Sequence, residues 1–259
     1  MSLEESHIIS KGYSPKAMAM FSPCVGLVAL LLLHPSIQAS DLDPYMTTNA
    51  NQQQEIVDKH NSLRRAVQPP ASDMLKMEWN SEAASHAQSW VNQCLLKSSP
   101  PESRKLNGVG CGENIFMSSI ILSWSQVIQK WYDEGKTFEY GSAATSTNTK
   151  IRVYTQVVWY NSYQVGCAVA FCPGQPVFKY FYACQYCPAG NREDKISTPY
   201  TKGEPCGACP DACDNGLCTN PCKYKDVYTN CPEMKKLYGC DIPLMKQCPA
   251  SCKCTTEIK

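Results

Sequence analysis

The chain has 259 residues, with 24 Lys and Arg against 23 Asp and Glu, so its formal net charge is +1. This balance excludes nucleic acid or acidic membrane as the main partner, because both require a strongly basic surface. A hydrophobic content of 43% suffices for a buried core and excludes intrinsic disorder. The 17 Cys stand out, and ten of them fall within residues 206–254.

The beginning of the chain has the pattern of a targeting segment. Residues 25–33 are an uninterrupted apolar run followed by Pro and small residues. This run is typical of a secretory signal peptide and is too short to span a bilayer. Cleavage after Ala39 or Ser40 would remove Cys24 and leave an even number of Cys in an oxidising compartment, where thiols pair. We therefore expect a secreted, extracellular product, with residues 1–40 as an upstream extension and signal peptide.

Three segments predict helices in the part that follows. Residues 55–67 place apolar side chains and one His on a single helical face. Asn80 is a good N-cap for a second helix, in which Ala, Trp and Val recur at helical spacing. Ser123 and Gln126 have the form of a capping box, and an apolar stripe with two Trp follows them.

After residue 150 the pattern changes to that of strands. Residues 153–160, 165–171 and 177–184 are short, rich in Val, Tyr, Phe and Trp, and separated by turn signals. We expect these strands to be antiparallel. Helices followed by strands predict an α+β domain, in which helices cover a sheet.

The last part of the chain changes composition again. Residues 192–205 are polar, with Pro and Gly, and are interpreted as a linker. The ten-Cys segment beyond has few large apolar residues, so it needs disulfides for stability. CxxC pairs begin at Cys184 and Cys206 with zinc-ribbon spacing, but a secretory compartment favours disulfides over zinc or a redox role. We expect no metal and no cofactor.

Five motifs carry a resemblance to a known family. They are HNSLRRAV (60–67), PPASDMLKMEWN (69–80), CGEN (111–114), YTQVVW (154–159) and YACQYCPAGN (182–191). With the ten-Cys tail, they resemble the cysteine-rich secretory proteins of the CAP superfamily, and the tail is most similar to mammalian epididymal, sperm-associated members. The resemblance implies an α-β-α sandwich (the CAP domain), a disulfide hinge, and a small helical module similar to potassium-channel-blocking sea-anemone toxins. These parts would span residues 41–195, 196–221 and 222–259.

The resemblance also implies a disulfide pairing, which the sequence alone does not define. The implied pairs are Cys94–Cys172, Cys111–Cys187 and Cys167–Cys184 in the sandwich, Cys206–Cys213 and Cys209–Cys218 in the hinge, and Cys222–Cys254, Cys231–Cys248 and Cys240–Cys252 in the toxin-like module.

The superfamily cleft presents two His and two Glu, a set able to hold a divalent metal. By resemblance the two acids correspond to Glu113 and Glu134, whereas Ser98 and Val153 stand where the family has its His. Only the acidic half of the set remains, so we expect no metal site. Paired carboxylates could act as acid and base if one pKa were raised, but we interpret this pair as structural.

Nucleophilic catalysis has little support in the residues. After the signal segment only His60 and His86 remain. His60 lies on the apolar helical stripe and is interpreted as a hydrogen-bonded core residue, and His86 is expected to be exposed. All 16 remaining Cys are expected to pair, which leaves no free thiol. We therefore predict a protein that is not an enzyme.

The tail combines Lys with aromatic residues, a combination that small toxins use to block cation pores. We select Lys235, Lys236, Tyr238 and Lys246 as partner-binding residues, all expected to be exposed, although a simple solvated surface is the alternative. The toxin's Lys would correspond to Lys246, which has no aromatic neighbour in the sequence. This disfavours pore plugging and leaves modulation of gating through a broader surface open.

Tyr163 and Gln164 are selected as a further partner-binding stretch, on the sandwich. The function expected from all these features is recognition of a cell-surface protein, ion channel or receptor on sperm or egg. The roles implied by the resemblance are sperm maturation, gamete interaction or ion-channel regulation. No nucleic acid and no transmembrane segment are expected. An alternative is carriage of a small lipid or sterol in the cleft, and a third, weaker one is a metal-dependent hydrolase.

Overall fold

The structure is a computed structural model that describes residues 42–142 and 151–259. The predicted signal segment, residues 1–40, lies outside the described residues. A four-stranded sheet with strand order β1-β5-β6-β4 forms the centre of the fold. β1 pairs with β5 in parallel, and the other neighbouring strands are antiparallel. The strands are β1 Glu78–Trp79, β4 Gly112–Ser118, β5 Gln164–Phe171 and β6 Tyr180–Cys187.

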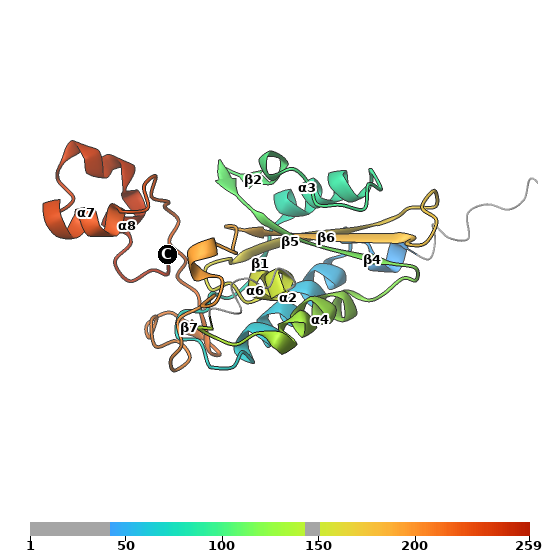
Figure 1. The fold of residues 1–259 in the computed structure, drawn as a ribbon, viewed down its shortest axis with the longest axis horizontal. Helices are drawn as coiled ribbons and strands as arrows, with labels where there is room; N and C mark the ends of the chain where they lie inside the picture. The colour runs from blue at the N-terminus through green and yellow to red at the C-terminus, as the bar shows by residue number, and fades with distance from the viewer. Residues whose placement is uncertain (1–41, 143–150) are drawn as a thin grey trace, which may run out of the picture. The chain divides into compact units, whose positions relative to one another are not determined.

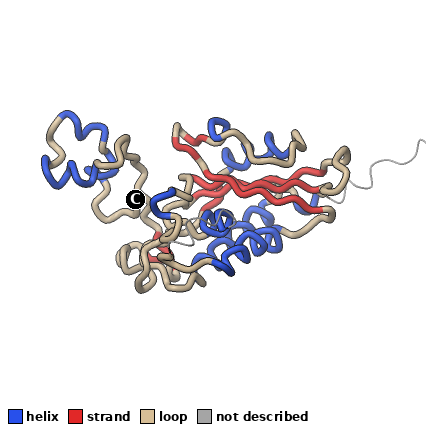
Figure 2. Tube along the Cα trace, in the orientation of Figure 1, coloured by secondary structure: helices blue, strands red, loops and turns tan. Residues whose placement is uncertain are grey.

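Helices cover both faces of this sheet (Figures 1 and 2). One face packs against α2 (Ala50–Arg65), α4 (Trp124–Asp133) and α6 (Arg152–Val157). The opposite face packs against α3 (Ser81–Val91). The α-β-α sandwich implied by the family resemblance is therefore confirmed.

Two of the predicted helices, α3 and α4, begin at the capping residues that the sequence indicated. The Asn80 side chain accepts a hydrogen bond from Ala83 N at 2.8 Å, which caps α3. Ser123 and Gln126 form both halves of a capping box at the start of α4. These bonds satisfy backbone N–H groups that have no partner within the helix.

Small residues on β5 let α3 lie close to the sheet. A Cβ at Gly166 would lie 2.1 Å from the backbone nitrogen of Ala84, so no side chain fits there. Ala168 and Ala170 continue the same face of β5 and pack against α3. This close contact fixes the α3 layer on the sheet.

The prediction of a strand over residues 153–160 was wrong. Residues 152–157 form α6, and Tyr154, Val157 and Val158 lie at helical spacing with their side chains in the core. Burial along one helical face overrides the β-propensity of this Val- and aromatic-rich segment. β4, which was not among the predicted strands, pairs with β6 and completes the sheet.

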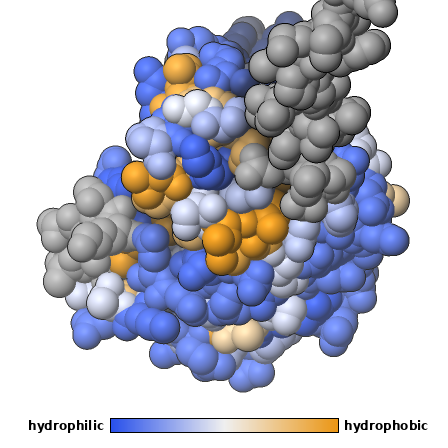
Figure 3. Space-filling model, turned by 90° about the vertical axis from the view of Figure 1, so that its right-hand side faces the viewer, coloured by the Kyte–Doolittle hydropathy of each residue, from blue (hydrophilic) through white to orange (hydrophobic). Residues whose placement is uncertain are grey.

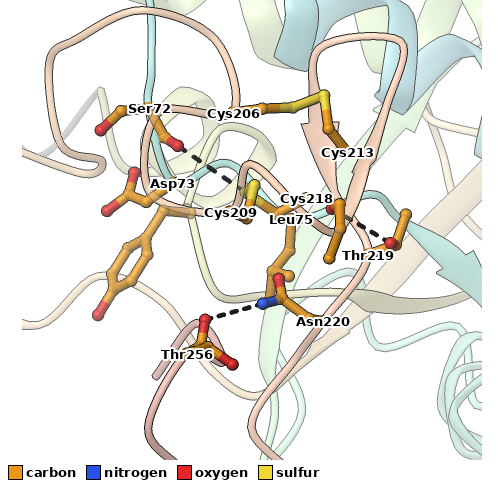
Figure 4. Close-up of a disulfide and its surroundings, with 12 residues drawn as sticks. Ser72, Asp73, Leu75, Cys206, Cys209, Cys213, Cys218, Thr219, Asn220 and Thr256 are labelled. Carbon is orange, nitrogen blue, oxygen red and sulfur yellow. Dashed lines mark hydrogen bonds between the residues drawn. A yellow bond between two sulfur atoms is a disulfide. The ribbon is translucent and has the colours of Figure 1, made fainter.

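The hinge is attached to the segment that leads into β1 (Figure 4). It contains a hairpin of β7 (Cys213–Asp214) and β8 (Leu217–Cys218), whose Asn215-Gly216 turn has positive φ at both positions. Cys218 N donates to the carbonyl of Met74 and Cys218 O accepts from Lys76 N, each at 2.8 Å. The hinge therefore continues the backbone hydrogen bonding of the sandwich.

The tail, residues 222–259, has little apolar core of its own. Its elements are α7 (Cys231–Tyr238), the 3-10 helix η6 (Pro243–Gln247) and α8 (Pro249–Lys253). Its buried cluster contains Met245 and the Cys231–Cys248 disulfide, with a few half-buried neighbours. Near its last residues, Cys222 N donates to the carbonyl of Ile258 at 2.8 Å, which joins the end of the chain to the start of the tail.

The structure contains eight disulfides, and their pairing is the one implied by the family resemblance. The remaining short elements are η1 Asp43–Tyr45, η2 Pro101–Ser103, η3 Glu134–Thr137, η5 Glu193–Lys195, and the hairpin strands β2 Lys105–Leu106 and β3 Val109–Gly110. In the part of the chain that the structure describes, none of the helices is long and apolar enough to cross a membrane.

Candidate functional site

Glu113 lies on the edge strand β4, and its carboxylate is fully engaged. It accepts hydrogen bonds from Ser99 N at 2.8 Å and from Ser99 Oγ at 2.6 Å. Arg104 Nη1 lies 3.2 Å from the same carboxylate and also donates to the carbonyl of Ser99 at 2.9 Å. The Glu113 side chain is 1% exposed. A buried carboxylate with a cation and two donors holds the loop after α3 against the sheet, which is a structural role.

The other cleft positions do not complete a metal site. Glu134 is exposed at the point where α4 ends and η3 begins. Ser98 is exposed in the loop, and the carbonyl of Val153 accepts a hydrogen bond from Asn114 Nδ2 at 2.8 Å. Within residues 42–142 and 151–259, no three His, Cys, Asp or Glu side chains are grouped so as to hold a metal ion. The residues present therefore do not fit the zinc that the superfamily cleft implies.

His60 is a core residue, as its position on the apolar stripe predicted. Its Nδ1 lies 2.7 Å from the carbonyl of Ile56, and its Nε2 lies 2.9 Å from the hydroxyl of Tyr186. Burial lowers the pKa of His60 from 6.5 to about 4, so the ring is neutral near pH 7. The expectation that His86 is exposed was wrong, because the residue is half-buried on α3 and its Nδ1 is shielded from solvent.

Arg64 is a buried cation that the sequence prediction missed. Its guanidinium donates twice to the carbonyl of Leu75, at 2.9 and 2.7 Å. It also donates to the carbonyls of Val157 and Trp159 at 2.9 Å, and of Tyr160 at 3.1 Å. Burial lowers its pKa to about 9, which leaves it charged at neutral pH. The sequence signal that could have indicated this burial is the position of Arg64, one helical turn after His60 on the apolar stripe.

Exposed apolar side chains concentrate in the tail. Ten large hydrophobic residues are strongly exposed in the described chain, and six of them lie within residues 222–259, led by Leu237 at 73%. We call these six the tail surface: Tyr224, Val227, Tyr228, Leu237, Tyr238 and Leu244. Such a density of exposed apolar groups makes this module a candidate for contact with a partner.

Two of the three predicted Lys are exposed beside the tail surface. Lys236 lies on α7 and Lys246 on η6, both open to solvent. The expectation that Lys235 is exposed was wrong, since its ammonium donates to the carbonyl of Ser251 at 2.7 Å and the residue is half-buried. Lys235 therefore joins α7 to α8 within the tail.

The tail contains a Lys–aromatic contact at an unpredicted place. Lys253 Nζ lies 4.6 Å from the ring centroid of Tyr224, a distance at which a cation is attracted to the ring face. Both residues are exposed, and they come from opposite ends of the module. This pair, and not Lys246, provides the combination of ammonium and ring.

Tyr163 and Gln164 lie at the start of β5 in the sandwich, whereas the other four predicted partner-binding residues lie in the tail. Tyr163 is half-buried and packs against the cluster that contains Leu75 and the hinge residue Cys218. Gln164 begins β5 and pairs with both β1 and β6. The same cluster contains Ile258 of the tail, but in the described structure no hydrogen bond, ion pair or ring contact joins Tyr163 or Gln164 to the four predicted tail residues.

The far end of the sandwich carries a smaller apolar area. Ile120 in the loop after β4, and Val177 and Phe178 in the β5–β6 hairpin loop, are exposed. Figure 3 looks onto this end, where hydrophobic side chains form separate orange areas within a mostly blue surface. This area is a second, weaker candidate for contact with a partner.

A cavity of about 640 Å³ lies between α2, β1 and the hinge hairpin. Charged and amide side chains form much of its lining, including Asp58, Arg65 and an ion pair between Lys76 and Asp214 at 2.6 Å. A sterol or acyl chain requires an apolar lining. The cavity therefore gives no specific support to lipid carriage.

Comparisons with known proteins agree along most of the chain. A model of the cysteine-rich secretory protein family matches residues 57–186, and a Crisp model matches residues 206–259. Cysteine-rich venom protein helothermine from Heloderma horridum horridum is 53% identical over 242 residues, 93% of this chain and 100% of that protein. Human cysteine-rich secretory protein 2 is 51% identical over 91% of this chain and 98% of that protein. The crystal structure of NaASP2 with Zn2+ has a TM-score of 0.55 and 30% identity, and covers 68% of this chain and 98% of that one.

Proposed function

Because the chain belongs to the cysteine-rich secretory protein family, we propose that it is an extracellular protein that acts by binding and not by catalysis. Its proposed partner is an ion channel, a receptor or another cell-surface protein on sperm or egg. The proposed roles are sperm maturation, gamete interaction or ion-channel regulation. The high identity to human cysteine-rich secretory protein 2, over nearly the full length of both chains, supports the family-level part of this proposal.

The observation that carries the proposal is the tail surface. Six large apolar side chains are exposed on a module that three disulfides hold in shape. Burying such side chains against a partner gains roughly 25 cal/mol for each Å² of apolar area removed from water. Because the module is already cross-linked, little chain entropy is lost when it binds.

Charge adds a preference for an acidic partner. Residues 222–259 contain seven Lys and no Arg, against four Asp and Glu. Exposed Lys residues speed encounter with an acidic surface more than they strengthen the final complex. The outer mouths of cation channels are acidic, so a channel mouth fits this combination of exposed apolar and basic side chains.

The contacts inside the sandwich support binding over catalysis. Glu113 is neutralised by Arg104, and both ring nitrogens of His60 are used in the core. Three hydrogen bonds hold the carboxylate of Glu113 and both ring nitrogens of His60 have partners, which disfavours either group as a general acid or base. The sandwich is therefore proposed to support and orient the tail.

The experiment compares two tail variants with matched sandwich variants. Leu237→Ser with Tyr238→Ser removes apolar contacts, and Lys236→Glu with Lys246→Glu reverses two exposed charges of the tail. Leu95→Ser and Lys97→Glu are the controls, because both residues are exposed in the loop after α3 and lie outside both candidate surfaces. Surface changes of this kind cost under about 0.5 kcal/mol of stability, so binding is measured on folded protein.

Binding of the labelled protein to sperm membranes, and its effect on membrane current, are the readouts. The apolar tail variant should bind at least about tenfold more weakly, and the charge variant should mainly lower the association rate. The controls should bind like the unmodified protein. Equal binding by the tail variants and the unmodified protein would refute the proposal.

A further inference from the structure

A smaller cavity, of about 320 Å³, lies where residues 195–201 meet the sandwich. It is separate from the cleft acids and from the tail surface. Five of the side chains that line it are chemically informative: Asp73, Tyr140, Tyr160, Lys195 and Tyr200. The volume is at the lower end of the range for small-molecule sites.

Asp73 supplies a buried carboxylate to this cavity. The residue is 8% exposed, and its Oδ1 accepts a hydrogen bond from Thr201 N at 2.8 Å. In residues 42–142 and 151–259 no Lys or Arg nitrogen lies within 4.0 Å of it. Desolvation raises the pKa of Asp73, and the hydrogen bonds from Thr201 and the more distant charge of Lys195 offset this only in part. A cation that entered the cavity would relieve this cost.

Three tyrosine rings line the same cavity. The rings of Tyr140 and Tyr200 lie 5.2 Å apart between centroids, and the Tyr140 hydroxyl donates to the carbonyl of Tyr200 at 2.6 Å. Tyr200 is 2% exposed, and its hydroxyl has no hydrogen-bond partner among the described residues. Aromatic faces attract cations, and several rings around one space are the usual way to bind a quaternary ammonium group.

Lys195 places a cation near one ring of this cavity. Its ammonium lies 5.8 Å from the ring centroid of Tyr160, and its side chain is otherwise exposed. At that distance and exposure the attraction is weak, so the ammonium is displaceable. The protein's own Lys is therefore a competitor for the site.

We propose that this cavity binds a small organic ammonium ion, with its alkyl groups against the tyrosine faces and its charge opposite Asp73. Lys195 competes with this ligand and weakens its binding. A carboxylate in the wall disfavours anions, and a single carboxylate supplies too few hard ligands for a metal ion. The inference does not depend on the tail or on its partner.

The test uses the mature, disulfide-bonded protein and choline as the probe, observed by ligand-detected NMR titration. The matched control ligand is the neutral carbon isostere of choline, in which a tert-butyl group replaces the trimethylammonium group. Variants are Asp73→Asn, which keeps the acceptor for Thr201 N, and Lys195→Gln. Lys202→Gln is the control variant, because Lys202 is exposed nearby and does not line the cavity.

Choline should saturate the unmodified protein with a Kd on the order of 1 mM, and the isostere should bind at least about tenfold more weakly. Asp73→Asn should weaken choline binding about tenfold, and Lys195→Gln should strengthen it about threefold. Lys202→Gln should change nothing, and near-UV dichroism should show every variant folded. The proposal is overturned if choline does not saturate, if the isostere binds equally well, or if Asp73→Asn binds choline like the unmodified protein.

Discussion

The sandwich and the tail each contain three disulfides, yet they are stabilised in different ways. The sandwich buries Trp124, Trp131 and Trp159 together with most of β5 and β6. The tail buries little more than Met245 and its own cystines. Similar numbers of cross-links therefore supplement a core in one region and replace it in the other.

This difference explains why exposed large apolar side chains are more frequent where the core is small. In the sandwich, large apolar residues are needed inside, and few remain at the surface. In the tail the disulfides fix the backbone, so Leu237 and Tyr238 can point into solvent without loss of the fold. The covalent frame leaves the tail surface free for a partner.

The largest effect we predict comes from the buried contacts of Arg64 in the sandwich. Arg64→Met should remove the donors of four buried carbonyls and lower the free energy of unfolding by about 4 kcal/mol. Arg65→Met is the matched control, because Arg65 is an exposed neighbour with one carbonyl contact to Asn215. It should cost under about 1 kcal/mol. Urea unfolding followed by Trp fluorescence measures the stability of both variants. A loss for Arg64→Met as small as that for Arg65→Met would show that the contacts of Arg64 are dispensable.

Two disulfides of equal loop length provide the next test. Cys167–Cys184 in the sandwich and Cys231–Cys248 in the tail both join residues 17 apart. Replacing both Cys of either disulfide with Ala should lower the free energy of unfolding by about 3 kcal/mol, because the unfolded chain is no longer held in a loop. The sandwich should remain folded because of its core, whereas the tail should unfold locally. Near-UV dichroism and the amide exchange of α7 distinguish these outcomes, and a tail that stays folded would contradict the comparison.

The pH dependence of stability should also separate the regions. His60 has a pKa of about 4 when folded and 6.5 when unfolded, so protonation favours unfolding. Sandwich stability should be full above pH 6.5 and fall between pH 6.5 and 4 by up to about 1.4 kcal/mol per pH unit. His60→Gln should remove this slope. The tail contains no His, so its unfolding should lack this step.

Asp73 contributes with the opposite sign. Its pKa is raised in the folded state, so the stability it adds increases as the pH falls. Asp73→Asn should therefore steepen the loss of sandwich stability on the acid side. Thermal unfolding at a series of acid pH values measures this slope. A slope that is the same with and without Asp73→Asn would mean that the carboxyl is not desolvated in solution.

The smallest effect we predict is a null result with zinc. Glu113 is engaged by Arg104 and Ser99, and no His stands at Ser98 or Val153. Zinc or EDTA should therefore leave the melting temperature of both regions unchanged. Calorimetry that found a tight zinc site would contradict the description of the cleft.

Sequence reasoning worked best where the signal is local. Asn80 and the pair Ser123 and Gln126 predict helix starts because their side chains bond to nearby backbone groups. The family resemblance supplied the disulfide pairing, which local patterns cannot supply. The sequence also contains Asn215-Gly216, a dipeptide typical of the two-residue turn that joins β7 and β8.

The errors came from distant contacts. The 153–160 segment has strand composition, but its burial against α4 and the sheet makes it a helix. The partnership of Glu113 with Arg104 depends on how the loop after α3 folds back, and no pattern in the sequence indicates it. Lys235 looked like a surface residue because its acceptor, the carbonyl of Ser251, lies on another helix.

Hydrogen–deuterium exchange during mild reduction of the intact protein tests the central claim most directly. The account predicts that amides of α7 and α8 lose protection as the tail disulfides open, while those of β5 and β6 remain protected by the core. Binding to sperm membranes should be lost in step with the tail amides. Loss of protection in both regions together, or binding that survives the unfolding of the tail, would contradict the account.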